Sequence, residues 1–465
     1  MTAASPRYDV AIIGAGVVGC AVFRELALHS VRCVLLERSA DILDGASKGN
    51  SAILHTGFDA PPGSLELRLM QAGRRRYLAD RDQFGLPILR TDAVLVAWTQ
   101  AELARLQPIR DKARRNGVTG VAPLDSAQLL ARFPRLSTAA QGALLVPGED
   151  IIDPWSSPLA YALQGIALGG QVLRQFEVTA ATRQNGAWQL AGAGQQITAR
   201  VVINCAGNYG DLVEALARPS RFAIRPRKGQ FVVFDKSAAQ HVPTILLPVP
   251  TERTKGVVIC PTIFGNVLVG PTAEDQDHRS DASVDRAALQ NLITQAARMV
   301  PALAAEPVTA TYAGLRPAND RDDYIVEVQP DQWITVAGIR STGLTVALGI
   351  AEHVRDLLAD TGQALIPVTD PVWPVLPNLA EHCPRDHQRP GRGDLICLCE
   401  LVTRDEVEAA LSGPLPAGNL GGLKRRTRAL MGRCQGFNCL AAVCALAEGR
   451  LSDPPPLTAG MHHAR

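Results

Sequence analysis

Residues 8–19 read Tyr8-Asp-Val-Ala-Ile-Ile13-Gly14-Ala-Gly16-Val-Val-Gly19, and this stretch decides the fold. Tyr8–Ile13 has the apolar pattern of a short buried strand, and the glycine turn leads into an amphipathic helix pattern from Cys20 to His29. Val31–Leu36 is a second apolar strand pattern, and it ends at Glu37. Strand, glycine turn, helix, strand and terminal acid together predict one βαβ unit of a parallel sheet.

The three glycines of this turn have separate physical roles in a dinucleotide-binding site. Gly14 permits the tight turn, Gly16 lets the backbone approach a pyrophosphate, and Gly19 lets helix and strand pack closely. The helix N-terminus presents free N–H groups to the phosphates, and Glu37 is placed to accept hydrogen bonds from ribose hydroxyls. The pattern predicts dinucleotide binding over a glycine turn without a ligand, but it does not separate FAD from NAD.

Later segments extend the same sheet and add a second domain. Arg200–Asn204 and Trp333–Ala337 are apolar strand patterns, and a helix pattern follows the second of them to about Leu358. Between them, antiparallel strands are predicted at 228–235, 243–250 and 256–271, with a hairpin at Gly265-Asn266 and an amphipathic helix over 285–300. We therefore expect an α/β fold in which a Rossmann-like domain contains an inserted α+β domain with an antiparallel sheet.

The expected organisation follows from these patterns and from composition. Residues 371–393 are rich in proline, histidine and arginine, which is typical of a linker. The expected units are an oxidoreductase region at 1–370, the linker, a small helical domain at 394–450 and a mobile tail at 451–465. Within the first unit, the nucleotide-binding parts are expected at about 1–85, 140–215 and 325–370, and the inserted domain at about 86–139 and 216–324.

Composition excludes several classes of protein. The 465 residues carry a formal net charge of +2, so nothing indicates a nucleic-acid or anionic-membrane partner. No stretch reaches the ~18 consecutive apolar residues that a membrane span needs. We also find no signal peptide pattern, and we expect a cytoplasmic protein.

Four cysteines lie close together near the end of the sequence. Cys397-x-Cys399 and Cys434-x4-Cys439 flank two helix-like stretches, at 404–412 and 420–431, that would cover a shared site. In a cytosolic chain such a cluster indicates a metal site before it indicates disulfides. The first pair is closer than the usual C-x2-C of a zinc site.

The segment Gly45-Ala-Ser-Lys-Gly-Asn50-Ser51-Ala-Ile-Leu-His55-Thr-Gly57 favours FAD, because here the chain resembles the D-amino-acid-oxidase-like flavoproteins. It is most similar to the branch that holds glycerol-3-phosphate dehydrogenases and L-2-hydroxyglutarate dehydrogenases. Asp153-Pro154, Tyr312-Ala-Gly314-Leu-Arg316-Pro317 and the segment from Gly338 to Thr345 match further elements of that branch. The resemblance covers roughly residues 8–365.

The resemblance implies which residues surround the cofactor. The Asn-Ser and His-x-Gly elements would lie along the flavin, and the helix N-terminus after Gly338 would face its pyrimidine ring, where reduced flavin carries negative charge. An ordinary strand-to-helix turn is the alternative for that last segment. The expected FAD-binding residues are Gly14, Gly16, Gly19, Glu37, Arg38, Ser47, Asn50, Ser51, Val178, Gly207, Gly338, Gly343, Leu344 and Thr345.

The C-terminal cysteines resemble a second family. Ile396-Cys-Leu-Cys-Glu-Leu-Val-Thr403, Lys424-Arg-Arg-Thr-Arg428 and Met431-Gly-Arg-Cys434-Gln-Gly-Phe-Asn-Cys439 are similar to the bacterioferritin-associated-ferredoxin-type domain. That resemblance implies a [2Fe–2S] cluster held by Cys397, Cys399, Cys434 and Cys439. A zinc site and unligated thiols are the alternatives. The basic run Lys424–Arg428 would either offset the cluster's negative charge or form a solvated helix face.

Three residues are expected to act on the substrate. His55 is a candidate for the base that takes the substrate's heteroatom proton, with packing that orients the flavin, or covalent attachment to it, as the alternatives. Arg316 is expected to bind an anionic substrate group, with a structural salt bridge as its alternative, and Arg340 is a second candidate. Glycerol-3-phosphate dehydrogenases follow His-x-Gly with an arginine that this chain lacks, which brings that part nearer to the 2-hydroxyglutarate enzymes.

These patterns predict a dehydrogenase that passes electrons from a small anionic substrate to FAD, to [2Fe–2S] and then to an external acceptor. The expected substrate is sn-glycerol 3-phosphate, followed by a 2-hydroxy acid and then an opine or imino acid. A second redox protein is an expected partner, and the two would form a hetero-oligomer. The alternatives from another class are a redox or iron sensor and a non-catalytic electron-transfer subunit.

Overall fold

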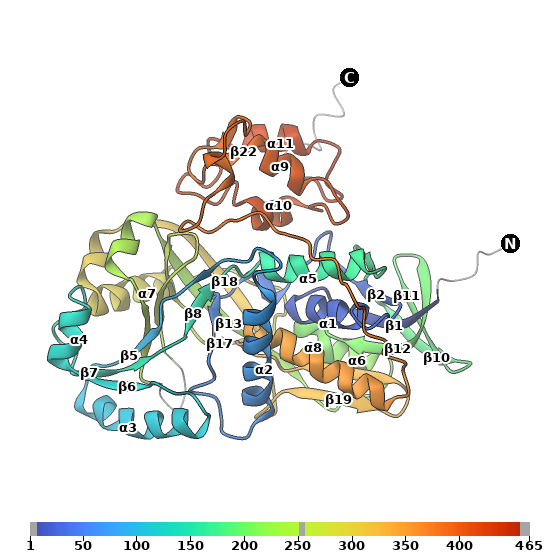
Figure 1. Ribbon diagram of the computed structural model, residues 1–465, viewed down its shortest axis with the longest axis horizontal. Helices are drawn as coiled ribbons and strands as arrows, with labels where there is room; N and C mark the ends of the chain where they lie inside the picture. The colour runs from blue at the N-terminus through green and yellow to red at the C-terminus, as the bar shows by residue number, and fades with distance from the viewer. Residues whose placement is uncertain (1–6, 251–255, 456–465) are drawn as a thin grey trace.

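The computed structural model describes residues 7–250 and 256–455, and it contains two large sheets with a smaller domain above both (Figure 1). The first sheet has eight strands, and β1 pairs in parallel with β2 on one side and β12 on the other, as the βαβ pattern predicts. The order β10-β11-β12-β1-β2-β9 ends in an antiparallel ribbon, and β20 joins β12 in parallel. Its elements are β1 (Arg7–Ile13), α1 (Val17–Ala27), β2 (Cys33–Leu36), β9 (Gln171–Leu173), β10 (Ala180–Gln184), β11 (Ala187–Gly192), β12 (Gln195–Asn204), β19 (Ile325–Gln329) and β20 (Trp333–Ala337).

Four helices lie on this sheet or pack against the helices that lie on it. They are α1, α2 (Leu65–Asp80), α5 (Ser156–Ala167) and α8 (Gly343–Asp360), and α6 (Gly210–Ala215) lies beside β12 and β20. α2 and α8 cross where both carry glycine: a Cβ on Gly73 would lie 2.1 Å from the carbonyl oxygen of Thr345, and one on Gly349 would lie 2.1 Å from that of Leu69. This close crossing fixes the N-terminus of α8 relative to the rest of the domain.

The second sheet has nine strands and forms the inserted domain. Its strands pair antiparallel, except that β14 pairs in parallel with β5. The predicted hairpin is confirmed, because β15 and β16 pair around Gly265-Asn266, and the predicted helix is α7, which begins after the N-cap Asp285. The elements of this domain are β5 (Ala93–Ala97), α3 (Gln100–Arg115), β6 (Ala122–Asp125), α4 (Ser126–Arg132), β7 (Gly142–Val146), β13 (Ile224–Phe234), β14 (Ile245–Pro248), β15 (Val258–Pro261), β16 (Val267–Gly270), β17 (Glu274–Asp275), α7 (Arg286–Met299) and β18 (Val308–Asn319).

One boundary differs from the expected one. β7 pairs with β5 and β6 in the nine-stranded sheet, so this sheet continues to residue 146 rather than to 139. The two large units are then joined by a small sheet of β3 (Ile53–Leu54), β4 (Ile88–Leu89) and β8 (Asp150–Ile152). The short 3-10 turns are η1 (Ala46–Lys48), η2 (Gly207–Tyr209), η3 (Lys236–His241), η4 (Pro301–Ala305) and η5 (Asp386–Gln388).

The C-terminal domain is small and mostly helical, with its own buried apolar cluster around Val402, Leu423 and Val443. It contains β21 (Leu395–Cys397), β22 (Val402–Thr403), α9 (Arg404–Ala410), α10 (Leu420–Thr427) and α11 (Leu440–Ala447). Apart from η5, residues 371–393 form no helix or strand, but they are not free of the main body, since Trp373 packs edge-on against Phe84 at 4.8 Å between ring centroids.

The basic run of α10 docks this domain onto the nucleotide-binding domain. Arg426 makes a bidentate ion pair with Asp41, at 2.6 and 2.8 Å, and Arg425 pairs with Asp44 at 3.3 Å. Gly422 is required at this contact, because its Cβ would lie 1.5 Å from the Asp41 carboxylate. The expectation that these arginines form a solvated face is therefore wrong for Arg425 and Arg426.

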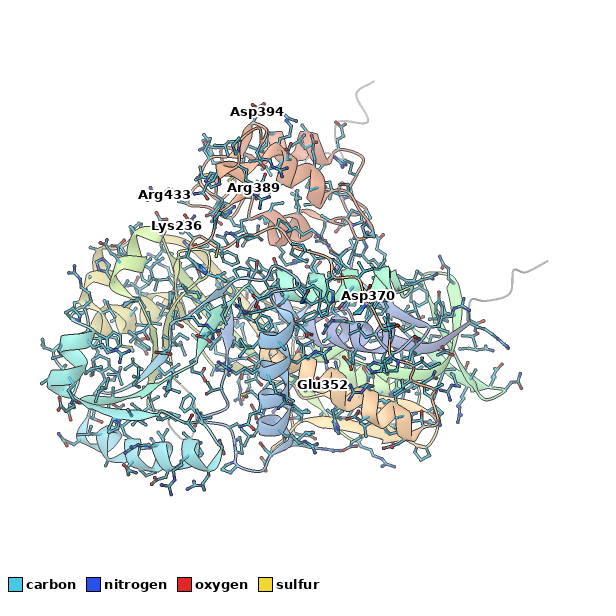
Figure 2. All side chains as sticks on the ribbon, viewed as in Figure 1. Lys236, Glu352, Asp370, Arg389, Asp394 and Arg433 are labelled. Atoms are coloured by element: carbon cyan, nitrogen blue, oxygen red, sulfur yellow. The ribbon has the colours of Figure 1, made fainter. Side chains whose placement is uncertain are left out.

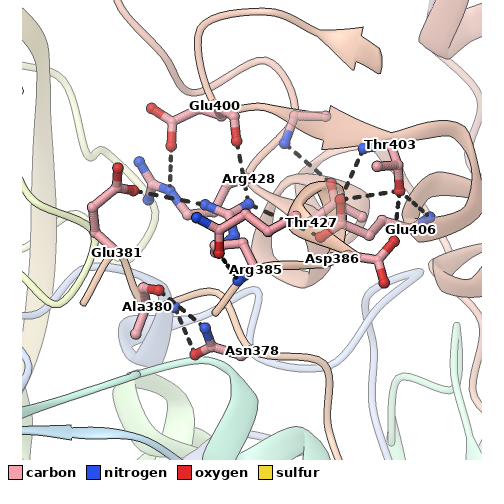
Figure 3. A network of polar contacts seen from close by, with 12 residues as sticks. Asn378, Ala380, Glu381, Arg385, Asp386, Glu400, Thr403, Glu406, Thr427 and Arg428 are labelled. Carbon is pink, nitrogen blue, oxygen red and sulfur yellow. Dashed lines mark hydrogen bonds and ion pairs between the residues drawn. The ribbon is translucent and has the colours of Figure 1, made fainter. Parts of the chain in front are cut away.

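A second contact joins the C-terminal domain to the inserted domain. Figure 2 labels Lys236 and Arg433 close to this junction; Arg433 pairs with Asp235 at 2.5 Å and Lys236 with Glu400 at 3.6 Å. Figure 3 shows the polar network behind it, in which Arg428 donates to the Glu400 carboxylate at 2.8 Å and Arg385 donates to the Glu400 carbonyl at 3.2 Å. The domain is thus held at two separated points. No helix within residues 7–250 or 256–455 is long and apolar enough to cross a membrane.

Candidate functional site

A cavity of about 1280 Å³ lies where the two large sheets meet, along the carboxyl ends of β1, β2 and β12. This edge of a parallel sheet is where open α/β folds bind nucleotides. Most of the residues predicted from the sequence line this one cavity. They are Gly14, Gly16, Glu37, Arg38, Ser47, Asn50, Ser51, His55, Val178, Gly207, Arg316, Gly338, Arg340, Gly343 and Leu344.

Gly14 forms the tight turn with a backbone that favours glycine. Its φ is +102°, and a Cβ there would lie 2.6 Å from the carbonyl oxygen of Cys205. Gly19 lies outside the cavity lining and packs helix against strand, since its Cβ would lie 1.9 Å from the carbonyl oxygen of Gly14. Ser47 Oγ accepts a hydrogen bond from the N–H of Val17, the first residue of α1. The tight turn and the close packing of helix and strand are as the motif predicts, and contact of Gly16 with a pyrophosphate stays a prediction.

Replacing Gly14 by Ala is expected to abolish retention of flavin during purification. The strained φ costs about 1–2 kcal/mol in an L-residue, and the clash with Cys205 moves the turn that would hold the pyrophosphate. The flavin-to-protein absorbance ratio measures the effect. Gly186→Ala is the matched control, because Gly186 has φ +78° but nothing within 4 Å of its Cβ position. Equal flavin content in both variants would contradict the assigned role of Gly14.

Glu37 and Arg38 lie at the end of β2. The Glu37 carboxylate accepts backbone N–H groups of Ala15 and Ser39, both at 2.9 Å, so it holds the glycine turn in place while it lines the cavity. The Arg38 guanidinium stacks on the ring of Tyr209 at 3.8 Å from its centroid. Contact of Glu37 with a ribose stays a prediction.

The Asn-Ser element is fixed from both sides. The Asn50 side chain donates to the Ser47 carbonyl and accepts from the Ala52 N–H, while Tyr312 donates to the Asn50 carbonyl at 2.8 Å. Thr345 is not part of the cavity wall, and its role is one of support. Its hydroxyl donates to the Ile53 carbonyl and accepts the backbone N–H of His55.

The N-terminus of α8 points its first residues at the cavity. Gly343 and Leu344 line the wall, and the helix begins there with free N–H groups and the positive end of its dipole. Gly338 has φ +72°, and a Cβ there would lie 2.2 Å from the Asn319 side chain. The segment is therefore a compact turn whose donors can stabilise negative charge.

His55 has a partner that the sequence did not indicate. Its Nδ1 lies 2.9 Å from the carboxylate of Glu149, which also accepts the N–H and the hydroxyl of Thr56 at 2.6 and 2.7 Å. Burial raises the pKa of Glu149, but the charge of His55 and the hydrogen bonds from His55 and Thr56 outweigh it, so that this pKa lies below its usual value. Glu149 escaped prediction because it belongs to no recognised motif and lies 94 residues from His55 in the sequence.

Arg316 and Arg340 differ in the partners of their guanidinium groups. The Arg316 guanidinium donates only to backbone carbonyls, those of Arg227, Lys228 and Thr272, and forms no ion pair within the described residues. Burial, with the nearby charge of Arg227, lowers its pKa to about 10. Arg340 pairs with Glu66 at 3.2 Å and donates to the Asp322 carbonyl at 2.7 Å. The structural salt bridge considered for Arg316 is not present in the part of the chain that the structure describes, and binding of an anion by Arg316 stays a prediction.

The four C-terminal cysteines converge in two pairs. The Cys399 thiol lies beside Cys434, and the Cys439 thiol lies beside Cys397. Cys397 and Cys439 are buried, whereas Cys399 and Cys434 are partly exposed. Within residues 7–250 and 256–455, no group of three or more His, Cys, Asp or Glu side chains is arranged to hold a single metal ion.

Backbone N–H groups surround the sulfur atom of Cys434. The N–H of Asn438 holds the pKa of the Cys434 thiol below its usual value, and the Cys399 thiol and the N–H groups of Gly436 and Phe437 contribute to the same shift. Four thiols in this arrangement suit either a [2Fe–2S] cluster or a tetrahedral zinc ion, so the identity of the metal stays a prediction.

Known proteins with similar sequences are flavin-dependent or act on glycerol 3-phosphate. The family model described as "FAD dependent oxidoreductase" matches residues 9–357. The glycerol 3-phosphate dehydrogenase of Caloramator mitchellensis is 31% identical over 453 residues, which cover 96% of this chain and 94% of the relative. The glycerol 3-phosphate oxidase of Mycoplasma pneumoniae is 28% identical over 75% of this chain and 94% of its own. One component of the anaerobic glycerol-3-phosphate dehydrogenase of Escherichia coli (strain K12) is 26% identical over 96% of this chain and 88% of its own.

A solved structure shows the same fold. The dithionite-reduced L-alpha-glycerophosphate oxidase from Mycoplasma pneumoniae, with FAD bound, superposes with a TM-score of 0.74 at 26% identity. The match covers 79% of this chain and 97% of the oxidase. The chain therefore belongs to the family of FAD-dependent oxidoreductases, and within it to the glycerol-3-phosphate dehydrogenase and oxidase branch.

Proposed function

We propose that this enzyme oxidises sn-glycerol 3-phosphate and passes the electrons through a [2Fe–2S] cluster in its C-terminal domain to an external acceptor. The observation that carries the substrate is Arg316, a half-buried guanidinium without a carboxylate partner in the described part of the chain, in the wall of the cavity that also contains His55. A guanidinium binds phosphate or carboxylate bidentately. The nearly full-length likeness to a glycerol 3-phosphate dehydrogenase favours the phosphate.

The residues around the cavity have different roles in the proposed reaction. Arg316 binds the phosphate and holds the substrate in one orientation, and Nε2 of His55 accepts the proton of the hydroxyl that is oxidised. When bound, FAD supplies the hydride acceptor. The N–H groups of Gly343 and Leu344 stabilise the negative charge that this transfer creates. Arg340 is balanced by Glu66, so we assign it to the shape of this wall rather than to the phosphate.

Anaerobic stopped-flow spectroscopy with several substrates tests the substrate assignment. Glycerol 3-phosphate is expected to bleach the flavin band with saturation, whereas glycerol, which lacks the phosphate, is expected to react at least 100-fold less efficiently, because Arg316 is then left buried without a partner. L-2-hydroxyglutarate and an opine are the comparison substrates. Faster bleaching by either of them would overturn the glycerol 3-phosphate assignment and leave the flavin chemistry intact.

Two observations support the cluster. The four thiols lie in two adjacent pairs, and the domain that holds them is docked on the flavin domain through Arg426 and Asp41. The match to the solved oxidase covers 97% of the oxidase but only 79% of this chain. The match to the dehydrogenase of Caloramator mitchellensis, in contrast, covers 96% of this chain. When bound, such a cluster takes electrons singly, which suits a partner protein or another one-electron acceptor.

Changing Cys434 to Ser is expected to remove the cluster while it leaves flavin in place. Loss of one thiolate of four should lower the iron content from about two atoms per chain to well under one. Iron analysis and the electron paramagnetic resonance signal of dithionite-reduced protein measure this. Cys444→Ser is the matched control, since Cys444 lies in the same domain outside the two pairs. Equal iron in Cys434→Ser and unchanged protein, or zinc in both, would refute the cluster.

A further inference from the structure

Glu149 is a buried acid whose side-chain hydrogen bonds all go to His55 and Thr56. Its side chain is only 1% exposed, and its carboxylate accepts hydrogen bonds from the His55 ring and from the N–H and hydroxyl of Thr56. Burying a carboxylate is costly unless it is hydrogen-bonded and balanced by charge. His55 is the only ionisable group that contacts it in the part of the chain that the structure describes.

The charged side chains near Glu149 form ion pairs with other residues. On the elements around His55, Arg74 and Arg90 both pair with Asp150, Lys112 pairs with Asp59, and Arg340 pairs with Glu66. Arg316 is bound to carbonyl groups on the sheet of the inserted domain. The negative charge of Glu149 is therefore left to act on His55.

We propose that Glu149 is a positioning residue that fixes the tautomer of His55 and stabilises its protonated ring during catalysis. This inference rests on the proposed role of His55 as the base. Because Nδ1 donates its proton to Glu149, the lone pair of Nε2 is free to face the cavity. The backbone of His55 is held as well, since its N–H donates to Thr345 at the start of α8.

The proton and electron balance of the step is simple. The hydroxyl proton of the substrate moves to Nε2 of His55, and the O–H bonding pair becomes the second bond of the carbonyl group. A hydride leaves the carbon that carried the hydroxyl group and moves to the flavin, so the substrate loses two electrons and two hydrogens. His55 then carries a positive charge 2.9 Å from the Glu149 carboxylate, and the carboxylate stabilises that charge without taking the proton.

The test uses the purified flavoenzyme and three variants, Glu149→Gln, Glu149→Asp and Asp150→Asn. Glutamine keeps the size of the side chain and an acceptor for Thr56 but removes the charge. The rate of flavin reduction by glycerol 3-phosphate is expected to fall on the order of 100-fold in Glu149→Gln, with flavin content and the substrate dissociation constant nearly unchanged. Glu149→Asp should recover part of the rate.

A second readout is independent of turnover. The titration of the His55 ring, followed by nuclear magnetic resonance in oxidised enzyme without substrate, should move to lower pH in Glu149→Gln, because loss of a neighbouring carboxylate disfavours the protonated ring. The acid limb of the reduction rate should move in the same direction. Asp150→Asn removes an adjacent buried carboxylate that pairs with Arg74 and Arg90 and should leave both profiles in place.

The outcomes separate this inference from the proposed function. If His55→Asn reduces flavin as fast as the unchanged enzyme, the base assignment fails and Glu149 loses its role with it. If His55→Asn is slow but Glu149→Gln keeps the rate and the titration of His55, the base assignment stands and the role of Glu149 is refuted. A slow Glu149→Gln whose His55 titration is unshifted would show that Glu149 acts only by packing, which also overturns the proposal.

Discussion

Replacing Arg316 by Ala is expected to weaken binding of glycerol 3-phosphate by about 30-fold to several thousand-fold, because loss of one partner of a buried charged pair costs about 2–5 kcal/mol. Flavin content should not change, since Arg316 bonds only to carbonyls of Arg227, Lys228 and Thr272. The concentration dependence of flavin reduction measures the dissociation constant. Arg316→Lys should recover part of the affinity, because the charge remains but the planar fork is lost.

Arg225→Ala is the matched control for this experiment. Arg225 lies on β13 like Arg227, but its side chain is 73% exposed and pairs with the exposed Asp277. Its removal lowers the charge of the domain by the same amount and should change the dissociation constant less than about 2-fold. An equal effect of both variants would mean that the enzyme attracts phosphate through its overall charge, and that Arg316 is not the binding group.

Replacing Asp41 by Ala is expected to destabilise the docking of the C-terminal domain by about 3–5 kcal/mol, because it leaves the buried Arg426 without its partner. The Asp41 side chain is fully buried and that of Arg426 is 7% exposed, and Asp41 also accepts the N–H of Gly418. The undocked domain should expose residues 371–393 to proteases. Limited proteolysis and urea unfolding measure the effect.

Asp44→Ala provides a graded comparison, since Asp44 is 20% exposed and its contact with Arg425 is longer, at 3.3 Å. Its loss should destabilise docking less than the loss of Asp41, because the Asp44 carboxylate is partly exposed and Arg425 keeps its hydrogen bond to the Ile42 carbonyl at 2.9 Å. Unchanged proteolysis of the linker in Asp41→Ala would contradict the view that α10 anchors the domain, and the contacts of Arg433 and Lys236 would then be sufficient for docking.

The strongest local patterns of the sequence predicted the fold well. The alternation of strand, glycine turn and helix at residues 8–37 depends on neighbours in the chain, so β1, α1 and β2 are placed correctly from sequence. The Gly265-Asn266 hairpin and α7 with its Asp285 cap are local in the same way. Most of the residues identified by motif resemblance do line the cavity, because each motif places its residues at a strand end or a helix start.

Contacts between distant segments were beyond the sequence patterns. Glu149 contacts His55 although 94 residues separate them in the sequence, and no periodic pattern of apolar residues could identify such a partner. The arginines of α10 look like a solvated face, and only the fold shows that Asp41 and Asp44 lie opposite Arg426 and Arg425. The balance of Arg340 by Glu66 was missed for the same reason, because ion-pair partners are set by tertiary packing.

The most direct test of the whole account is one anaerobic visible spectrum, recorded as glycerol 3-phosphate is added to enzyme that contains both flavin and iron. The account predicts that the flavin band bleaches first and that the broader iron–sulfur absorption then declines, while Cys434→Ser shows only the flavin change. A flavin band that stays unchanged with glycerol 3-phosphate, in protein that dithionite still reduces, would contradict the account.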